Sequence, residues 1–298
     1  MYCFLIGLRL FIMINQYMRE EDAKNKVMVD LWSPKETDVD QTTVFQWING
    51  ILNHILWSRY QYWAKHFNLG QNRESIELGC GYGKFSLLLG LVGVKTTLLD
   101  YNASILENAS KLHSRIGLRP HVINKDLLQC EQNLKNTFDI ACSFGTLEHF
   151  SGLNRLLAFQ AHVYYLKPGG LLFISVPNRN AIFYRIAMTL RRMFGLFPKD
   201  FFEQPFSINE LNKIALQSNV RPLEIGSVST LKEDFNYWII TNVKSLYRKI
   251  FHIEKKETAL TSQTHCLEEL DFSKAVPDNR TYLDKMFSYS LIFVGVKE

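Results

Sequence analysis

Short apolar runs alternate with helical segments between residues 75 and 178, and this alternation constrains the fold more than any other feature of the sequence. The runs predict five strands, at 75–79, 95–100, 120–124, 138–145 and 171–178. Helices are expected from about Lys84, over 102–117 and over 152–166. Strands that alternate with helices indicate a parallel sheet of β-α-β units, with ligands bound beyond the carboxyl ends of the strands.

The remaining segments extend this core. Residues 45–67 carry apolar side chains at the spacing of one helical face. Two further strands are predicted at 222–230 and 289–297, and helices such as 235–251 between them. We therefore expect four parts, namely an N-terminal extension (1–44), a core (45–178), a helical cap (179–220) and C-terminal strands with a second helical insertion (221–298, inserted at about 231–288).

The first 14 residues are apolar but contain Arg9. A membrane-spanning helix needs about 20 apolar residues, so this segment is too short to cross a bilayer. Three interpretations stay open: a buried or interfacial helix, a true start at Met13 or Met18, or a membrane contact.

Composition excludes some classes of protein. The five cysteines form no C-x-x-C pair, which indicates reduced thiols in a cytoplasmic protein and not a zinc site or a disulfide framework. The net charge of +5 comes mainly from residues 179–256. No strongly basic stripe is present, so a nucleic-acid partner is not expected.

Glycines occupy every second position of "ELGCGYG", directly after the first predicted strand. Gly79, Gly81 and Gly83 do not fit the dinucleotide fingerprint G-x-G-x-x-G, because position 84 is Lys84. Glycine lets the backbone approach a ligand closely and adopt positive φ. With Glu77 in the preceding strand, the turn suits a ligand that carries a positive group.

Two acids follow the next two strands. Asp100 ends the second strand, where a carboxylate can accept hydrogen bonds from a ribose diol. Asp126 follows the third strand and is placed to accept a hydrogen bond from an exocyclic amine such as that of adenine. The pair indicates an adenosine whose phosphates are absent.

These motifs, over residues 72–178 and more weakly the last strand, resemble the class I S-adenosylmethionine-dependent methyltransferases, in their small-molecule, ubiquinone-pathway-like branch. The resemblance implies a Rossmann-like α/β fold, with a doubly wound seven-stranded sheet whose last strand is antiparallel and with helical cap insertions. It also implies S-adenosylmethionine as cofactor. The cofactor-binding residues it implies are Glu77, Gly79, Cys80, Gly81, Gly83, Asp100, Tyr101, Asp126, Leu127, Ser143 and Phe144.

Glu148 and His149 follow the fourth strand, where an acceptor should lie. His149 is either the general base of methyl transfer or a residue that packs or caps a helix start. Some relatives carry E-x-x-E-H here and bind a divalent ion. The first acid is replaced by Gly145 in this chain, so we expect no metal.

The segment 179–206 is aromatic and basic. In the family, insertions at this place cover the acceptor pocket, which makes Phe183, Tyr184, Phe201 and Phe202 candidate lid residues. A basic amphipathic helix can also lie on a membrane. A third interpretation is that its apolar face, at Ile182, Phe183, Ile186, Ala187, Leu190, Met193 and Phe194, packs on the domain.

The sequence thus predicts methyl transfer to an oxygen or nitrogen atom of a small or medium organic acceptor, apolar or aromatic in character. Three alternatives differ in class. They are a methyltransferase that acts on a lipid or lipid-linked acceptor at a membrane surface, a non-enzymatic cofactor-binding scaffold, and a nucleic-acid methyltransferase.

Overall fold

A computed structural model describes residues 41–193, 202–238, 272 and 278–298. The described chain contains a seven-stranded sheet with the order β3-β2-β1-β4-β5-β7-β6. The strands are β1 Glu74–Leu78, β2 Lys95–Asp100, β3 His121–Asn124, β4 Phe138–Phe144, β5 Leu166–Pro177, β6 Val220–Ser227 and β7 Ser290–Lys297. Strands β1 to β5 pair in parallel, and β7 pairs antiparallel with both β5 and β6. The predicted doubly wound sheet with an antiparallel last strand is confirmed.

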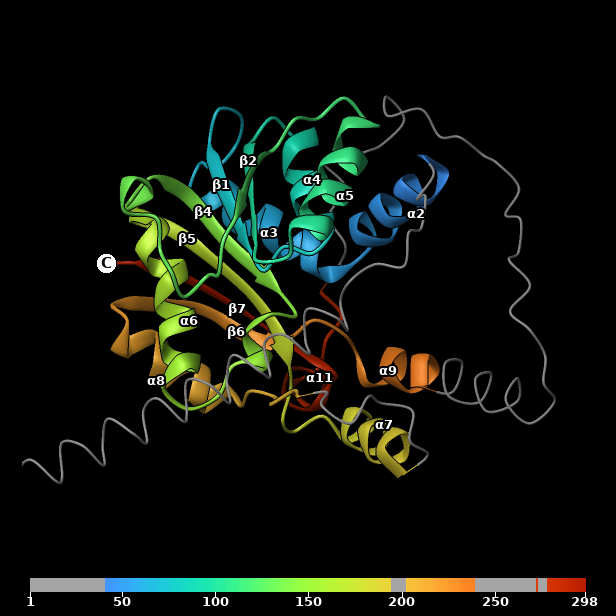
Figure 1. Cartoon of the computed structure of the whole chain (residues 1–298). Coiled ribbons are helices and arrows are strands. Elements are labelled where there is room, and N and C mark those ends of the chain that lie inside the picture. The colour runs from blue at the N-terminus through green and yellow to red at the C-terminus, as the bar shows by residue number, and fades with distance from the viewer. Residues whose placement is uncertain (1–40, 194–201, 239–271, 273–277) are drawn as a thin grey trace, which may run out of the picture.

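Helices cover both faces of the sheet (Figure 1). Their bounds are α2 Gln41–Leu52, α3 Ile55–His66, α4 Lys84–Leu91, α5 Ala103–Ser114, α6 Gly152–Tyr165, α7 Ile182–Met193, α8 Ile208–Gln217, α9 Leu231–Trp238 and α11 Tyr282–Phe287, with 3₁₀ turns η1 Gln132–Leu134 and η2 Leu147–His149. Helices α2 to α5 contribute to the core on one face, and α6 and α8 to the core on the other.

Alternation along β4 shows how one strand serves both cores. Ile140 and Cys142 are buried in the cluster formed with α2 to α5, whereas Ala141 is buried in the cluster formed with α6 and α8. Successive side chains of a strand point to opposite faces, so a central parallel strand must be apolar throughout. This is why the strand could be recognised as a continuous apolar run.

The predicted helix over 45–67 is two helices. Helix α2 ends at Leu52 and α3 begins at Ile55. The side chain of His54 caps α3 by accepting a hydrogen bond from Leu56 N at 3.2 Å. The apolar spacing continues across the break, because residues of both helices are buried in the same core. The periodicity of the apolar residues alone therefore could not reveal the break between α2 and α3.

Helix α7 buries a different face from the predicted one. Tyr184, Ala187 and Met188 are buried, while Ile182 is 52%, Ile186 42% and Met193 73% exposed. Phe183 lies against Phe235 of α9, with ring centroids 5.4 Å apart. The interpretation in which the whole apolar face packs on the domain is therefore wrong for these three side chains. Phe194 lies outside the described residues, as does most of the predicted helix 235–251.

Boundaries at the cap and the second insertion shift slightly. Strand β6 covers Val220–Ser227 and not 222–230, and α2 begins within the segment expected to be an extension.

Ser207 caps α8, accepting a hydrogen bond from Glu210 N at 3.2 Å. The carboxylate of Glu210 forms ion pairs with Arg155 at 2.8 Å and with Arg179 at 2.7 Å.

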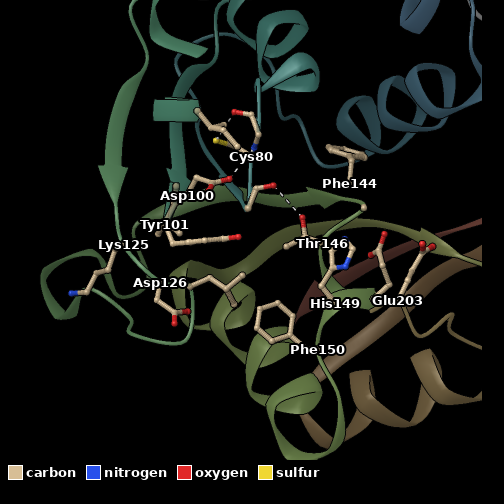
Figure 2. Close-up of a pocket in the computed structure, with 17 residues that line it drawn as sticks. Cys80, Asp100, Tyr101, Lys125, Asp126, Phe144, Thr146, His149, Phe150 and Glu203 are labelled. Atoms are coloured by element: carbon tan, nitrogen blue, oxygen red, sulfur yellow. Dashed lines mark hydrogen bonds between the residues drawn. The ribbon is translucent and has the colours of Figure 1, made fainter. Parts of the chain in front are cut away.

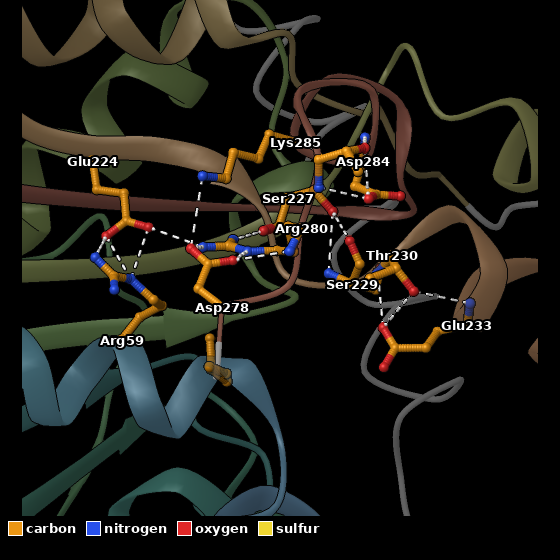
Figure 3. A network of polar contacts seen from close by, with 12 residues as sticks. Arg59, Glu224, Ser227, Ser229, Thr230, Glu233, Asp278, Arg280, Asp284 and Lys285 are labelled. Carbon is orange, nitrogen blue, oxygen red and sulfur yellow. Dashed lines mark hydrogen bonds and ion pairs between the residues drawn. The ribbon is translucent and has the colours of Figure 1, made fainter. Parts of the chain in front are cut away.

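An ion-pair network around the buried Arg280 joins α3, β6 and the segment before α11 (Figure 3). The Arg280 side chain is only 3% exposed, and its guanidinium pairs with Asp278 at 2.7 Å and Glu224 at 3.3 Å. The carboxylate of Glu224 also accepts hydrogen bonds from Arg59 and, at 2.8 Å, from Trp63 Nε1. Each charge is thus paired although the cluster is largely removed from water.

We predict that Arg280→Ala lowers the free energy of unfolding by about 2–3 kcal/mol, because Asp278 and the Ser227 carbonyl lose a buried charged donor, while Glu224 keeps Arg59. The matched control is Arg221→Ala, whose ion pair with Glu298 is exposed and should contribute at most about 1 kcal/mol. Urea unfolding of both variants measures the difference. Equal effects would contradict a structural role for the network.

Candidate active site

A cavity of about 420 Å³ opens at the carboxyl ends of β1, β2 and β4 (Figure 2). In parallel sheets this edge is where ligands bind, since the strand order reverses there. From β1 the sheet extends to one side through β2 and β3 and to the other side through β4 and β5, so the strand order reverses between β1 and β4. The lining residues are Gly79, Cys80, Gly81, Leu99, Asp100, Tyr101, Ile105, Lys125, Asp126, Leu127, Phe144, Gly145, Thr146, Glu148, His149, Phe150 and Glu203.

The turn after β1 forms one wall of the cavity. Gly79, Gly81 and Gly83 all have positive φ, between 52° and 61°. A Cβ at Gly79 would clash with the Thr146 side chain, whose hydroxyl donates a hydrogen bond to the Gly79 carbonyl at 3.1 Å. Only glycine fits here, for conformation as well as for space.

Asp100 connects this turn to β2. One carboxylate oxygen accepts a hydrogen bond from Gly81 N at 3.0 Å, and the other accepts one from Asn102 N at 3.0 Å. The side chain is buried, and burial raises its pKa above the ordinary value. The carboxylate is therefore held rigidly at the cavity wall, with its orientation determined by two backbone donors.

The far end of the cavity is formed by the residues that directly follow β2 and β3. Tyr101, Asp126 and Leu127 line it. Asp126 Oδ1 accepts a hydrogen bond from Leu128 N at 2.9 Å, and the Lys125 ammonium pairs with Glu131 at 2.7 Å. Figure 2 shows Asp100, Tyr101 and Asp126 grouped at this end, opposite His149 and Glu203.

His149 belongs to η2 at the opposite end. Its Nδ1 lies 2.9 Å from the carbonyl oxygen of Phe202. A carbonyl can only accept, so Nδ1 carries the proton and Nε2 of the neutral ring is the basic nitrogen. Burial lowers the pKa of His149, which favours this neutral form.

Glu148 lies beside it and is 4% exposed. Its Oε2 is buried and has no hydrogen-bond partner among the described residues. Burial, together with the nearby Glu203 carboxylate, raises the pKa of Glu148 to about 8. At neutral pH the side chain is therefore mainly a carboxylic acid that can donate a hydrogen bond.

The cavity brings together most of the predicted cofactor residues but not all of them. Glu77, Gly83 and Ser143 do not line it. Glu77 is buried and accepts hydrogen bonds from the backbone and hydroxyl of Ser86, and its pKa is raised to about 7 by burial. Contacts of these three residues with a cofactor stay predictions.

The predicted lid residues contribute indirectly. Tyr184 donates a hydrogen bond to the Glu203 carboxylate at 2.8 Å, and Phe202 offers its carbonyl to His149. Phe183 lies against α9, and Phe201 lies outside the described residues. Sequence reasoning missed Thr146 and Glu203; Glu203 is far from the other lining residues along the chain, and no local pattern marks it.

Comparison with known proteins identifies the family. A family model described as a methyltransferase domain matches residues 58–225. This chain belongs to that methyltransferase family. The resemblance to class I S-adenosylmethionine-dependent enzymes, predicted from the sequence, is confirmed.

Two relatives of this methyltransferase are ubiquinone biosynthesis O-methyltransferases. That of Rickettsia prowazekii (strain Madrid E) is 24% identical over 229 residues, covering 74% of this chain and 88% of its own. That of Dechloromonas aromatica (strain RCB) is 26% identical over 187 residues, covering 61% and 79%. The crystal structure of magnesium protoporphyrin IX methyltransferase from Synechocystis PCC 6803, with bound SAH, has a TM-score of 0.53 at 14% identity and covers 92% of this chain and 100% of that one. It shows that the fold is shared.

The methyltransferase uses S-adenosylmethionine. The residues present fit this cofactor. The glycine turn leaves one wall as bare backbone, and the buried Asp100 carboxylate is fixed at the cavity wall by two backbone donors. Because S-adenosylmethionine has no phosphate groups, the site needs no cation to bind them. Lys125, which lines the described cavity, is paired with Glu131.

Among the described residues no group of three or more His, Cys, Asp or Glu side chains is arranged to hold a metal ion. Gly145 replaces the acid expected of a metal-binding relative. It has a φ of 75°, and a Cβ there would lie 3.3 Å from Glu148 Oε1. A side chain at this position would be strained, so the backbone itself favours glycine.

The raised pKa of Glu148 predicts a pH-dependent stability. The pKa of Glu148 is 4.5 in the unfolded state and about 8 in the native state. Between these two pH values the native state holds a proton that the unfolded state has lost, so the free energy of unfolding falls as pH rises. His113 and His162, whose pKa values are lowered to about 4 by burial, act in the opposite direction, but only below their ordinary value of 6.5.

We therefore expect the cofactor-free protein to lose up to about 2 kcal/mol of stability between roughly pH 6.5 and pH 8. Glu148→Gln should remove most of this loss and leave the smaller part due to Glu77. Urea unfolding at the two pH values measures the difference. An identical loss in Glu148→Gln would show that Glu148 is not protonated in the native state.

Proposed function

We propose that this chain is a cytoplasmic enzyme that methylates an oxygen atom of a small or medium acceptor of apolar or aromatic character. When bound, S-adenosylmethionine supplies an electrophilic methyl group on a sulfonium. His149 would accept the hydroxyl proton on Nε2 while the acceptor oxygen takes the methyl group, and the methyl–sulfur bond would break to leave the neutral thioether S-adenosylhomocysteine. The O-methyltransferase relatives support oxygen over nitrogen.

The observation that carries the proposal is the hydrogen bond between His149 Nδ1 and the Phe202 carbonyl. It keeps the ring in one orientation and one tautomer, with Nε2 as the basic nitrogen. A residue that only capped η2 would not need a partner from a segment 53 residues away. The lowered pKa of His149 keeps the ring unprotonated at neutral pH.

The other site residues receive roles by position. Asp100 would bind the ribose hydroxyls, and Asp126 with Leu127 would bind the adenine. The turn Gly79–Gly83 would line the methionine part. We further propose that residues 179–220 form the cap over the acceptor, because Glu203 of this segment lines the acceptor end of the cavity and Tyr184 donates a hydrogen bond to it.

Two variants separate cofactor binding from catalysis. Asp100→Ala should weaken S-adenosylhomocysteine binding roughly a hundredfold or more, because charge-assisted hydrogen bonds are lost. His149→Ala should leave this binding intact and lower turnover by about 10²–10⁴. Calorimetry gives the binding constants, and each variant serves as the control for the other.

The acceptor is found by incubating cell extract with the enzyme and isotope-labelled S-adenosylmethionine, followed by mass spectrometry of the labelled metabolite. Turnover is then measured on that compound. A methyl group on nitrogen or carbon would contradict O-methylation, and unchanged turnover in His149→Ala would remove it as the base.

A second candidate is methylation of a lipid or lipid-linked acceptor at a membrane surface. The exposed side chains of Ile182, Ile186 and Met193 favour it, because they follow one side of α7, with exposed Arg185 and Arg192 on the same helix. Apolar and basic side chains together bind anionic membrane surfaces. Within the described part of the chain, no helix has the length and hydropathy to cross a bilayer.

We predict that the protein floats with anionic liposomes at low salt and that Ile186→Glu weakens this binding roughly tenfold, since it replaces an inserted apolar side chain by a charge. Leu216→Glu on α8, which changes an even more exposed apolar side chain on another helix (63% against 42%), is the control. A wild-type protein that stays at the bottom of the gradient removes this candidate.

A further inference from the structure

Two carboxyl side chains lie at the acceptor end of the cavity. Glu148 comes from η2 and Glu203 from the segment before α8, and both line the cavity. Glu148 Oε2 is buried without a hydrogen-bond partner among the described residues, so it can pair with a polar group of a ligand bound in the cavity. Figure 2 shows Glu203 beside His149, the proposed base.

Glu203 is held by an uncharged donor. The hydroxyl of Tyr184 donates to Glu203 Oε1 at 2.8 Å. This hydrogen bond orients the carboxylate but does not neutralise its negative charge, and no described Arg or Lys forms an ion pair with it. Burial and Glu203 raise the pKa of the tyrosine well above its ordinary value, so the hydroxyl stays a neutral donor.

Arg155 is the described cation that acts electrostatically on Glu148, but its hydrogen bonds and ion pair are made to other groups. The buried Arg155 guanidinium donates to the carbonyls of Gln204 at 2.8 Å and Pro205 at 3.2 Å, and its Nε pairs with Glu210 at 2.8 Å. Lys125 lines the opposite end of the cavity and pairs with Glu131. Among the described lining residues, no Arg or Lys faces Glu148 and Glu203.

We infer that Glu148 and Glu203 restrict the methyltransferase to acceptors whose group near the reacting oxygen is polar and uncharged, and exclude acceptors that carry a carboxylate there. This inference rests on the proposed function, which places the acceptor at this end. Glu148 offers a hydrogen bond to the uncharged group, and Glu203 repels an anion.

The expected discrimination is large. Two like charges on the order of 6 Å apart, at an effective dielectric constant of about 20, repel by an energy equal to roughly a hundredfold in affinity. Water at the mouth of the cavity reduces this effect. We expect the anionic member of a matched pair to bind at least about tenfold more weakly.

The probes are meta-hydroxybenzamide and meta-hydroxybenzoate, which have nearly the same shape and differ in charge. Calorimetry at about pH 7, on full-length protein saturated with S-adenosylhomocysteine, gives both dissociation constants. In the wild type the amide should bind at least about tenfold more tightly. Glu203→Gln should reduce this ratio at least about threefold, and the double variant Glu148→Gln/Glu203→Gln should bring it close to one.

The matched control is Glu107→Gln, which removes the same charge from the exposed surface of α5 and should leave the ratio unchanged. Thermal unfolding of each variant shows that it is folded. A wild type that binds both probes equally, binds neither or prefers the benzoate overturns the inference, as does an unchanged ratio in both variants. In these cases S-adenosylhomocysteine still binds and the proposed function stands; if it does not bind, both fail.

Discussion

The hydrogen bond from Gly81 N to the Asp100 carboxylate joins the ends of two neighbouring parallel strands, and the cofactor end of the site depends on it. It holds the glycine turn against β2 and at the same time orients the carboxylate. Cys80 N adds a second link, donating to the Leu99 carbonyl at 3.1 Å. Because both partners are fixed by the sheet, this half of the site is formed before any ligand arrives.

The acceptor end is organised by long-range contacts instead. Arg155 of α6 holds the carbonyls of Gln204 and Pro205, and its guanidinium lies 3.3 Å from the centre of the Phe206 ring. The segment before α8 is thereby held over η2, which brings the Phe202 carbonyl to His149. A single buried arginine thus positions a proposed base and a carboxylate that it does not touch.

This difference explains what could be predicted from the sequence. The strands and the cofactor end follow local patterns, since Gly79, Asp100 and Asp126 each lie at or just after a strand. Glu203 could not be found, because no spacing links it to His149. The face of α7 was also predicted wrongly. Its apolar positions outnumber those that a single buried face needs, and Tyr184 is buried through its bond to Glu203 and its packing against Tyr289.

The place of β7 has a consequence for how the chain is made. Among the described strands, β6 pairs with β7 alone, and β7 lies between β5 and β6. On the ribosome, β6 therefore emerges more than sixty residues before its neighbour, and must wait with both edges unpaired. A nascent chain interrupted in the second insertion would expose these edges. Chaperones and proteases of the cell would then recognise the unpaired strand in the C-terminal third of the chain, although the residues of the cofactor end are all synthesised before it.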